Sequence, residues 1–233
     1  IDTFNRKTLH ELYPQQMKYG RIDMRIRTWY NPNLESQHFF VPGIVAFVIM
    51  LISLLLTSIA IIREKEAGTM EQIIVTPLKS YEFILGKTIP YTIISLLQLV
   101  VVIIVATYWF EIPLVGSVSL LFFSACLFLL STLGIGLFIS TISRTQQQAM
   151  MMTFFFILPF FMLSGFVFPI ANMPEVVQWL SYLNPLRYFL VILRGIFLKG
   201  VGLDVLWPQC LSLAILGTVV FSGAIVRFKK RLD

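Results

Sequence analysis

The sequence predicts an all-α, polytopic membrane protein. Hydrophobic residues make up 57% of the 233 residues, the mean hydropathy is +0.82, and charged residues account for only 13%. That charged share is about half the value of a typical soluble domain. Five apolar runs also reach the length of about 20 residues at which a helix crosses a bilayer. Composition and patterning therefore exclude a disordered chain and a water-soluble globular domain.

The five expected spans contain no Asp, Glu, Lys, Arg or His. They cover residues 41–62, 88–108, 117–142, 149–168 and 205–226. Pro42 begins the first span, where its missing N–H costs nothing, and Pro90 lies near the start of the second. Pro159 lies in the middle of the fourth span and is expected to kink it.

A sixth apolar stretch, residues 186–198, is shorter than a span. It contains Arg187 and Arg194, which lie seven residues apart and so share a helical face. Each charge would cost about 2.5–3.5 kcal/mol at the centre of a spanning helix. A re-entrant or interfacial segment that begins at Asn184-Pro185, with both arginines reaching the headgroups, is favoured over a sixth span.

The distribution of basic residues sets the orientation. The C-terminal tail, the loop 63–87 and the loop 143–148 together hold nine bases, whereas the loops on the other side hold three. We therefore expect the C terminus and the loop 63–87 to be cytoplasmic, which places residues 1–40 outside. The six bases of that N-terminal segment are discounted, since a longer folded segment translocates largely regardless of its charge.

The chain divides into two predicted parts. Residues 1–40 are polar and mixed, and the alternation of polar and apolar residues over 21–27 is typical of a strand. This part is expected to be the remnant of an extracytoplasmic domain, because the first residue is Ile1 rather than Met. Residues 41–233 are expected to form the transmembrane domain.

The loop after the first span carries the most informative pattern. Gly68 is expected to break the preceding helix, and Thr69 with Gln72 three residues later has the pattern of a capping box that starts a new one. Pro77 ends this short helix. Its apolar face comprises Met70, Ile73 and Ile74, and its neighbouring acids are Glu66 and Glu71. From the pattern alone, a helix resting on the membrane surface and a helix docking into another protein are equally good interpretations.

Two stretches carry a resemblance to a known family. The string Arg-Glu-Lys-Glu-x-Gly-Thr-x-Glu-Gln-x-x-x-Thr-Pro-Leu at 63–78 resembles the loop after the second span of ABC-2-type transporter permeases, in the drug-resistance exporter branch. The segment 183–200, which begins Leu-Asn-Pro-Leu-Arg-Tyr-Phe, is similar to that family's stretch before the last span. With the order of the spans, the match covers about residues 39–233.

The resemblance implies an architecture and partners. The five spans would be the second to sixth of a six-span inner-membrane permease. That family pairs two permease subunits, identical or different, with two cytoplasmic ATPase subunits, and its coupling helix sits in a cleft of the ATPase. By this resemblance Glu66 and Glu71 would be charged contacts to the ATPase, and the apolar face of the short helix would fill the cleft.

The sequence shows no catalytic machinery of its own. Gly86-Lys87-Thr88 mimics the end of a phosphate-binding loop, but it leads into a span, and Tyr81 stands where the first glycine is needed. No span holds a histidine or an acid that could activate Ser164 or couple an ion. We expect no enzyme activity, metal or cofactor in this chain, and no nucleic-acid partner; ATP hydrolysis would belong to a partner chain.

These observations favour the permease subunit of an ATP-driven exporter for amphipathic or hydrophobic compounds. The fourth span is rich in Met and Phe, which suit varied apolar ligands, so Phe155, Pro159 and Met162 are candidate residues of a substrate path. Packing or lipid contact is the alternative role of each. The rival function is a non-transporting membrane scaffold or assembly subunit, and an intramembrane hydrolase is disfavoured by the missing base.

Overall fold

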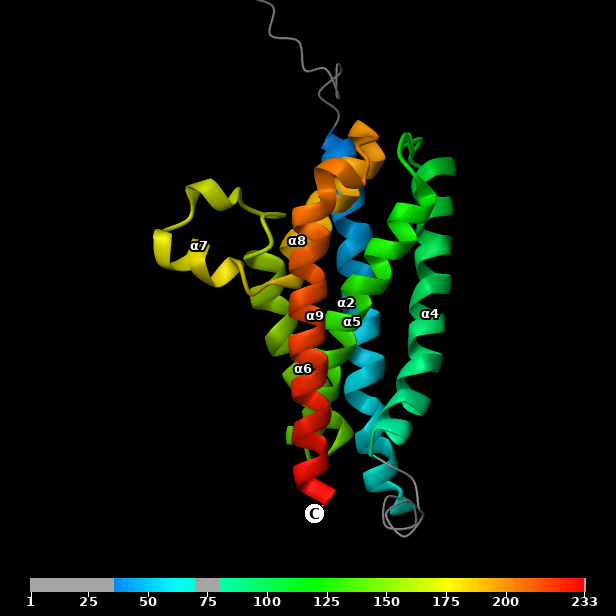
Figure 1. Cartoon of the computed structure of the whole chain (residues 1–233), viewed down its shortest axis with the longest axis vertical. Helices are drawn as coiled ribbons and strands as arrows, with labels where there is room; N and C mark the ends of the chain where they lie inside the picture. The colour runs from blue at the N-terminus through cyan, green and yellow to red at the C-terminus, as the bar shows by residue number, and fades with distance from the viewer. Residues whose placement is uncertain (1–35, 70–79, 233) are drawn as a thin grey trace, which may run out of the picture. The chain divides into compact units, whose positions relative to one another are not determined.

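A computed structural model describes residues 36–69 and 80–232 of the chain. In these two ranges every regular element is a helix, and the long helices run side by side (Figure 1). The elements are α2 (Ser36–Glu66), α4 (Ser80–Tyr108), α5 (Val118–Ile142), α6 (Gln146–Met162), the 3-10 turn η1 (Ile170–Asn172), α7 (Glu175–Ser181), α8 (Pro185–Arg194), the π-helical turn η2 (Gly195–Lys199) and α9 (Leu203–Leu232). The strand expected at 21–27 lies outside the described residues.

Four of the helices are long and apolar enough to cross a membrane. They cover Phe40–Glu66, Tyr81–Tyr108, Val118–Ile142 and Leu203–Phe228. These helices confirm the first, second, third and fifth expected spans. Pro42 and Pro90 lie inside α2 and α4, because each helix begins several residues before the apolar run that it contains.

The fourth expected span is wrong at its C-terminal end. Helix α6 ends at Met162, six residues before the expected limit of Phe168. Its 17 residues extend about 25 Å, less than the roughly 30 Å of a hydrocarbon core. The helix stops there because Gly165 has a left-handed backbone (φ +81°) and the hydroxyl of Ser164 accepts a hydrogen bond from the N–H of Phe166. Pro159 consequently lies in the last turn of α6 rather than at mid-span.

Helices α2 and α5 form the centre of the bundle. Inside the apolar windows of α2 and α5, 56% and 50% of the residues are buried, against 17% for α4 and 22% for α9. Helix α5 packs against α2 and against α9, and α2 also contacts α4, α6 and α8. The outward faces of α4 and α9 are therefore left for lipid or for another protein.

Close contacts between the central helices depend on glycines and hydroxyls. A Cβ atom at Gly134 would lie 2.8 Å from the backbone nitrogen of Phe221 in α9, and one at Gly136 would lie 2.7 Å from Cβ of Thr57 in α2. The Ser53 hydroxyl donates a hydrogen bond of 3.0 Å to Thr132, also between α2 and α5. Small residues permit this close approach of the helix backbones in a membrane.

Helix α8 is a buried, amphipathic helix of 10 residues that stops well short of the end of the bundle at which the C terminus lies. Asn184 is its N-cap: the side-chain oxygen accepts from the N–H of Leu186 at 3.0 Å, and the amide donates to the carbonyl of Phe160 at 2.6 Å. Pro185 occupies its first turn, and the Phe189 ring stacks on Phe128 with centroids 4.2 Å apart. Figure 1 shows α8 beside the half of α9 that is remote from the C terminus.

The stretch 186–198 does not continue into the last span. A left-handed Gly200 (φ +62°) separates η2 from α9. Arg187 and Arg194 are both partly buried, and the Arg187 guanidinium lies 4.0 Å from the centroid of the Tyr182 ring. Insertion of this stretch into the outer leaflet without crossing stays a prediction.

The contact between α5 and α9 supplies a stability test. We expect Gly134→Ala to lower the free energy of unfolding by about 1–3 kcal/mol, because the new methyl group meets the backbone of Phe221. The matched control is Gly223→Ala in α9, where no atom lies within 4 Å of the new Cβ and stability is expected to hold or rise. Thermal unfolding in detergent measures both, and equal losses in the two variants would contradict this packing.

Candidate functional site

Helix α2 ends where the expected break occurs. The N–H of Ala67 donates to the Arg63 carbonyl at 3.0 Å, and the N–H of Gly68 donates to the Lys65 carbonyl at 3.3 Å. Gly68 has a left-handed backbone (φ +72°), which glycine adopts without strain. This confirms that Gly68 breaks the helix, and a β-branched residue there would be strained even though the space around it is open.

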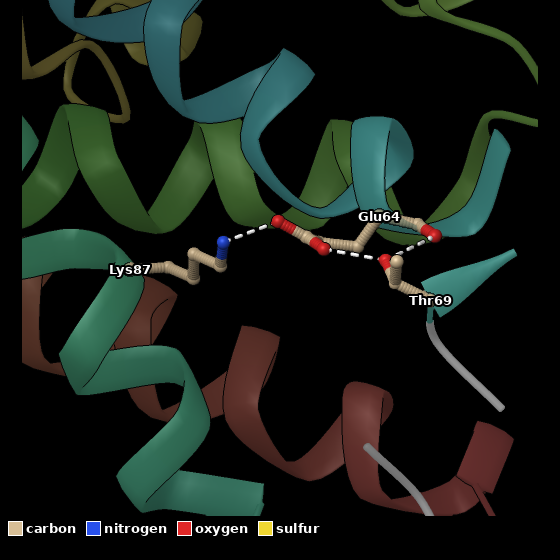
Figure 2. A network of polar contacts seen from close by, with 3 residues as sticks. All are labelled: Glu64, Thr69 and Lys87. Carbon is tan, nitrogen blue, oxygen red and sulfur yellow. Dashed lines mark hydrogen bonds and ion pairs between the residues drawn. The ribbon is translucent and has the colours of Figure 1, made fainter. Parts of the chain in front are cut away.

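Glu64, in the last turn of α2, joins both sides of the loop (Figure 2). One carboxylate oxygen forms an ion pair with Lys87 of α4. The other accepts a hydrogen bond of 2.6 Å from the Thr69 hydroxyl, which also lies 3.1 Å from the Glu64 carbonyl oxygen. The three side chains therefore fasten the end of α2 to the start of α4.

Glu66 fastens the same end of α2 to α6. Its carboxylate accepts a hydrogen bond of 2.8 Å from the backbone N–H of Gln146 and a second from the Gln146 side-chain amide. Gln146 is the first residue of α6, so the negative charge lies at the positive end of the helix dipole. Thr145 caps the same helix by accepting from the N–H of Gln148 at 3.1 Å.

We call Glu64 and Glu66, with their partners Thr69, Lys87 and Gln146, the carboxylate clamp. The family resemblance implies that Glu66 contacts an ATPase, which stays a prediction, and in the structure its carboxylate contacts α6 of the same chain. Glu64, Lys87 and Gln146 were not predicted as residues of the site. Their only signal in the sequence is position: each lies just outside an apolar run, where charged and polar side chains of neighbouring helices meet.

Most of the remaining residues of the expected coupling site lie outside the described part of the chain. Thr69 directs its hydroxyl hydrogen to Glu64, and its expected capping partner Gln72 lies outside the described residues. The remaining members outside the described residues are Met70, Glu71, Ile73, Ile74 and Pro77. Docking of this segment into another protein stays a prediction.

The candidate path residues share one face of α6. Phe155 is 75% exposed, and Pro159 and Met162 are also exposed at spacings of four and seven residues. The opposite face packs on α2, where the Thr153 hydroxyl donates a hydrogen bond of 2.9 Å to Ser58. The structure therefore brings the three residues together on an apolar face that the described chain leaves uncovered.

The contacts of the carboxylate clamp all lie within the described part of the chain. In the ranges 36–69 and 80–232 no three His, Cys, Asp or Glu side chains lie close enough to hold a metal ion. Two carboxylates, two residues apart on α2, contact α4 on one side and α6 on the other.

Comparison with known proteins places this geometry in context. The family model described as ABC-2 type transporter matches residues 19–198. The chain is 35% identical over 222 residues to the probable multidrug ABC transporter permease YbhR of Escherichia coli, covering 95% of this chain and 60% of the relative. It is 42% identical over 217 residues to YbhS of the same organism, described in the same words, covering 91% of this chain and 56% of the relative.

A more distant relative shares most of the same region. It is the ABC transporter G family member 20 of Dictyostelium discoideum, 25% identical over 191 residues, which cover 82% of this chain and 26% of that protein. The chain thus spans about 60% or less of the length of these three relatives.

The ion pair between Glu64 and Lys87 can be tested by a double-mutant cycle. The Lys87 and Glu64 side chains are 33% and 22% exposed, so we expect a coupling free energy of only about 0.5–1 kcal/mol between Glu64→Gln and Lys87→Met. The control cycle pairs Glu64→Gln with Arg144→Met. Arg144 is an exposed base in the link between α5 and α6, so the coupling free energy of this cycle should be zero. Unfolding in mixed detergent measures both, and equal coupling in the two cycles would contradict the pairing.

Proposed function

Because this chain belongs to the ABC-2 type transporter family, we propose that it is the membrane permease subunit of an ATP-driven exporter. ATP hydrolysis would take place on separate cytoplasmic ATPase subunits. The proposal is supported by the apolar helices able to span a membrane, by the family match over residues 19–198, and by relatives that are themselves described as multidrug ABC transporter permeases.

The transported compounds would be amphipathic or hydrophobic. The support is the uncovered face of α6, where Phe155, Pro159 and Met162 line up with no charged side chain among them. Phenyl rings and a thioether adapt to apolar ligands of different shape. Two permease subunits, identical or different, would enclose the path, since α6 alone lines only one side of it.

The single observation that carries the mechanism is the carboxylate clamp. ATP binding would close the ATPases and move the segment that follows Thr69. Because Glu64 holds α4 and Glu66 holds α6, the end of α2 would carry both helices with it. The movement of the segment after Thr69 would thus be passed to the face of α6 that bears the substrate path. The C terminus and this loop would lie on the cytoplasmic side of the inner membrane.

The link to α6 is the step most open to test. We expect Gln146→Ala to lower export of a hydrophobic dye several-fold, because it removes the side-chain half of the contact with Glu66. Co-purification of the ATPase should be unchanged, since this contact lies within the permease. The matched control is Gln147→Ala, an exposed neighbour in the same helical turn, with export expected at the original level.

The experiment uses the full-length permease with its ATPase in inverted vesicles, at equal membrane abundance. It also separates the exporter from the rival scaffold function. A scaffold would show no ATP-dependent dye movement in any variant. Loss of export in both glutamine variants, or in neither, would refute the role given to the clamp.

A further inference from the structure

A hollow of about 450 Å³ lies beside the first turns of α4. The described residues in its wall all belong to this helix: Glu82, Phe83, Gly86, Lys87, Pro90 and Tyr91. They bracket the start of the apolar run that covers residues 88–108. Figure 1 shows α4 at the edge of the bundle, with its first turns at the end where the C terminus lies. The hollow therefore lies where a spanning helix passes from water into hydrocarbon.

Two opposite charges stand in the wall of this hollow. Glu82 lies in the first turn of α4 and is exposed. Lys87 is 33% exposed, and its ion pair with Glu64 (Figure 2) engages one of the three N–H donors of the ammonium group. The five residues from Glu82 to Lys87 correspond to about 7.5 Å along the helix axis. A single ligand that carries both a cationic and an anionic group can therefore engage both side chains.

An apolar ridge continues from the hollow toward the middle of α4. Pro90, Ile94, Leu97 and Val101 are exposed and follow one another at spacings of four, three and four residues. Residues with this spacing lie on one face of a helix. A charged hollow at the membrane boundary with a hydrocarbon surface next to it matches the two parts of a phospholipid.

Gly86 leaves room in the hollow. It is exposed, and no atom lies within 4 Å of a Cβ atom built at this position. Because Gly86 belongs to the wall, a longer side chain there would extend into the hollow. This position therefore offers a way to fill the hollow without disturbing the packing between the helices.

We propose that the hollow binds the headgroup of phosphatidylethanolamine, from the leaflet at the end of the bundle where the C terminus lies. The ammonium group of the lipid donates hydrogen bonds to the Glu82 carboxylate, and the phosphate accepts one from the Lys87 ammonium. Hydrogen bonds between ionised groups are the strong ones. The rings of Phe83 and Tyr91 flank the headgroup, and an acyl chain lies along the ridge that begins at Pro90.

The charges of the hollow favour a zwitterionic lipid with N–H donors. Glu64, Lys87 and Glu82 together carry one negative charge, so an anionic headgroup adds repulsion, whereas the ammonium of ethanolamine compensates Glu82. A choline headgroup carries the same charge, but its quaternary nitrogen has no hydrogen to donate to the carboxylate. A water-soluble zwitterion lacks the acyl chain that the ridge contacts, which is why a lipid is the ligand.

Native mass spectrometry of the full-length permease tests this binding. The protein in detergent is titrated with phosphatidylethanolamine, phosphatidylcholine or phosphatidylglycerol, all with the same acyl chains. We expect the phosphatidylethanolamine adduct to form at a several-fold lower lipid concentration than the other two. Glycerophosphoethanolamine, which lacks acyl chains, should not displace it. Equal binding of the three lipids, or displacement by the headgroup alone, would overturn the proposal.

Two variants locate the lipid. Gly86→Leu fills the hollow and should abolish the preference for phosphatidylethanolamine. Glu82→Gln keeps the shape of the side chain but removes its charge, so phosphatidylglycerol should bind as well as phosphatidylethanolamine. The matched control is Gly223→Leu in α9, where a new Cβ also meets no atom within 4 Å and the preference should be kept. An unchanged preference in either variant, or its loss in the control, would overturn the proposal.

Discussion

The structure depends on one constraint: the hydrocarbon core of a membrane contains no water to satisfy polar groups. Backbone groups are therefore bonded within helices, and ionised side chains stand near helix ends, as Arg63 and Glu64 do on α2, Lys87 on α4 and Arg227 on α9. Between the ends, neighbouring helices can recognise one another only through shape and through short hydroxyl contacts such as Ser53 with Thr132. Ionic contacts between helices are consequently gathered where the chain meets water.

The carboxylate clamp follows from this constraint. Helix α2 is the central helix that contacts α4, α6 and α8, and its last turn carries two acids at the boundary. Those acids contact two different neighbours, at Lys87 in the third turn of α4 and at Gln146, the first residue of α6. The helix then ends at Gly68, whose backbone is left-handed. The contacts of α2 with two neighbouring helices and its sharp end at Gly68 thus lie next to each other, and the proposed coupling role rests on this arrangement.

Much of the fold could be predicted because apolar composition is a property of single segments. Four spans, the break at Gly68 and the start of a helix at Asn184-Pro185 follow from residues that lie close together in the sequence. The partner of Glu66 could not be predicted, because Gln146 lies 80 residues away and the rotation of each helix decides which side chains meet. The early end of α6 depends on the turn at Ser164 and Gly165, which apolar composition does not reveal. Helix α7 was not predicted, because seven residues are too few to show a helical periodicity in the sequence.

The central claim is that the end of α2 and the start of α6 move as one body. Spin labels at Ala67 and Gln147, both exposed, report the distance between them in the full transporter. Pulsed electron paramagnetic resonance should give the same distance between the two labels, within the width of its distribution, for the nucleotide-free and the ATP-trapped complex. A second label pair, at Ala67 and on the ATPase, confirms that trapping occurred. A change of several ångströms between Ala67 and Gln147 on ATP binding would show that the clamp opens during the cycle, and would contradict the account.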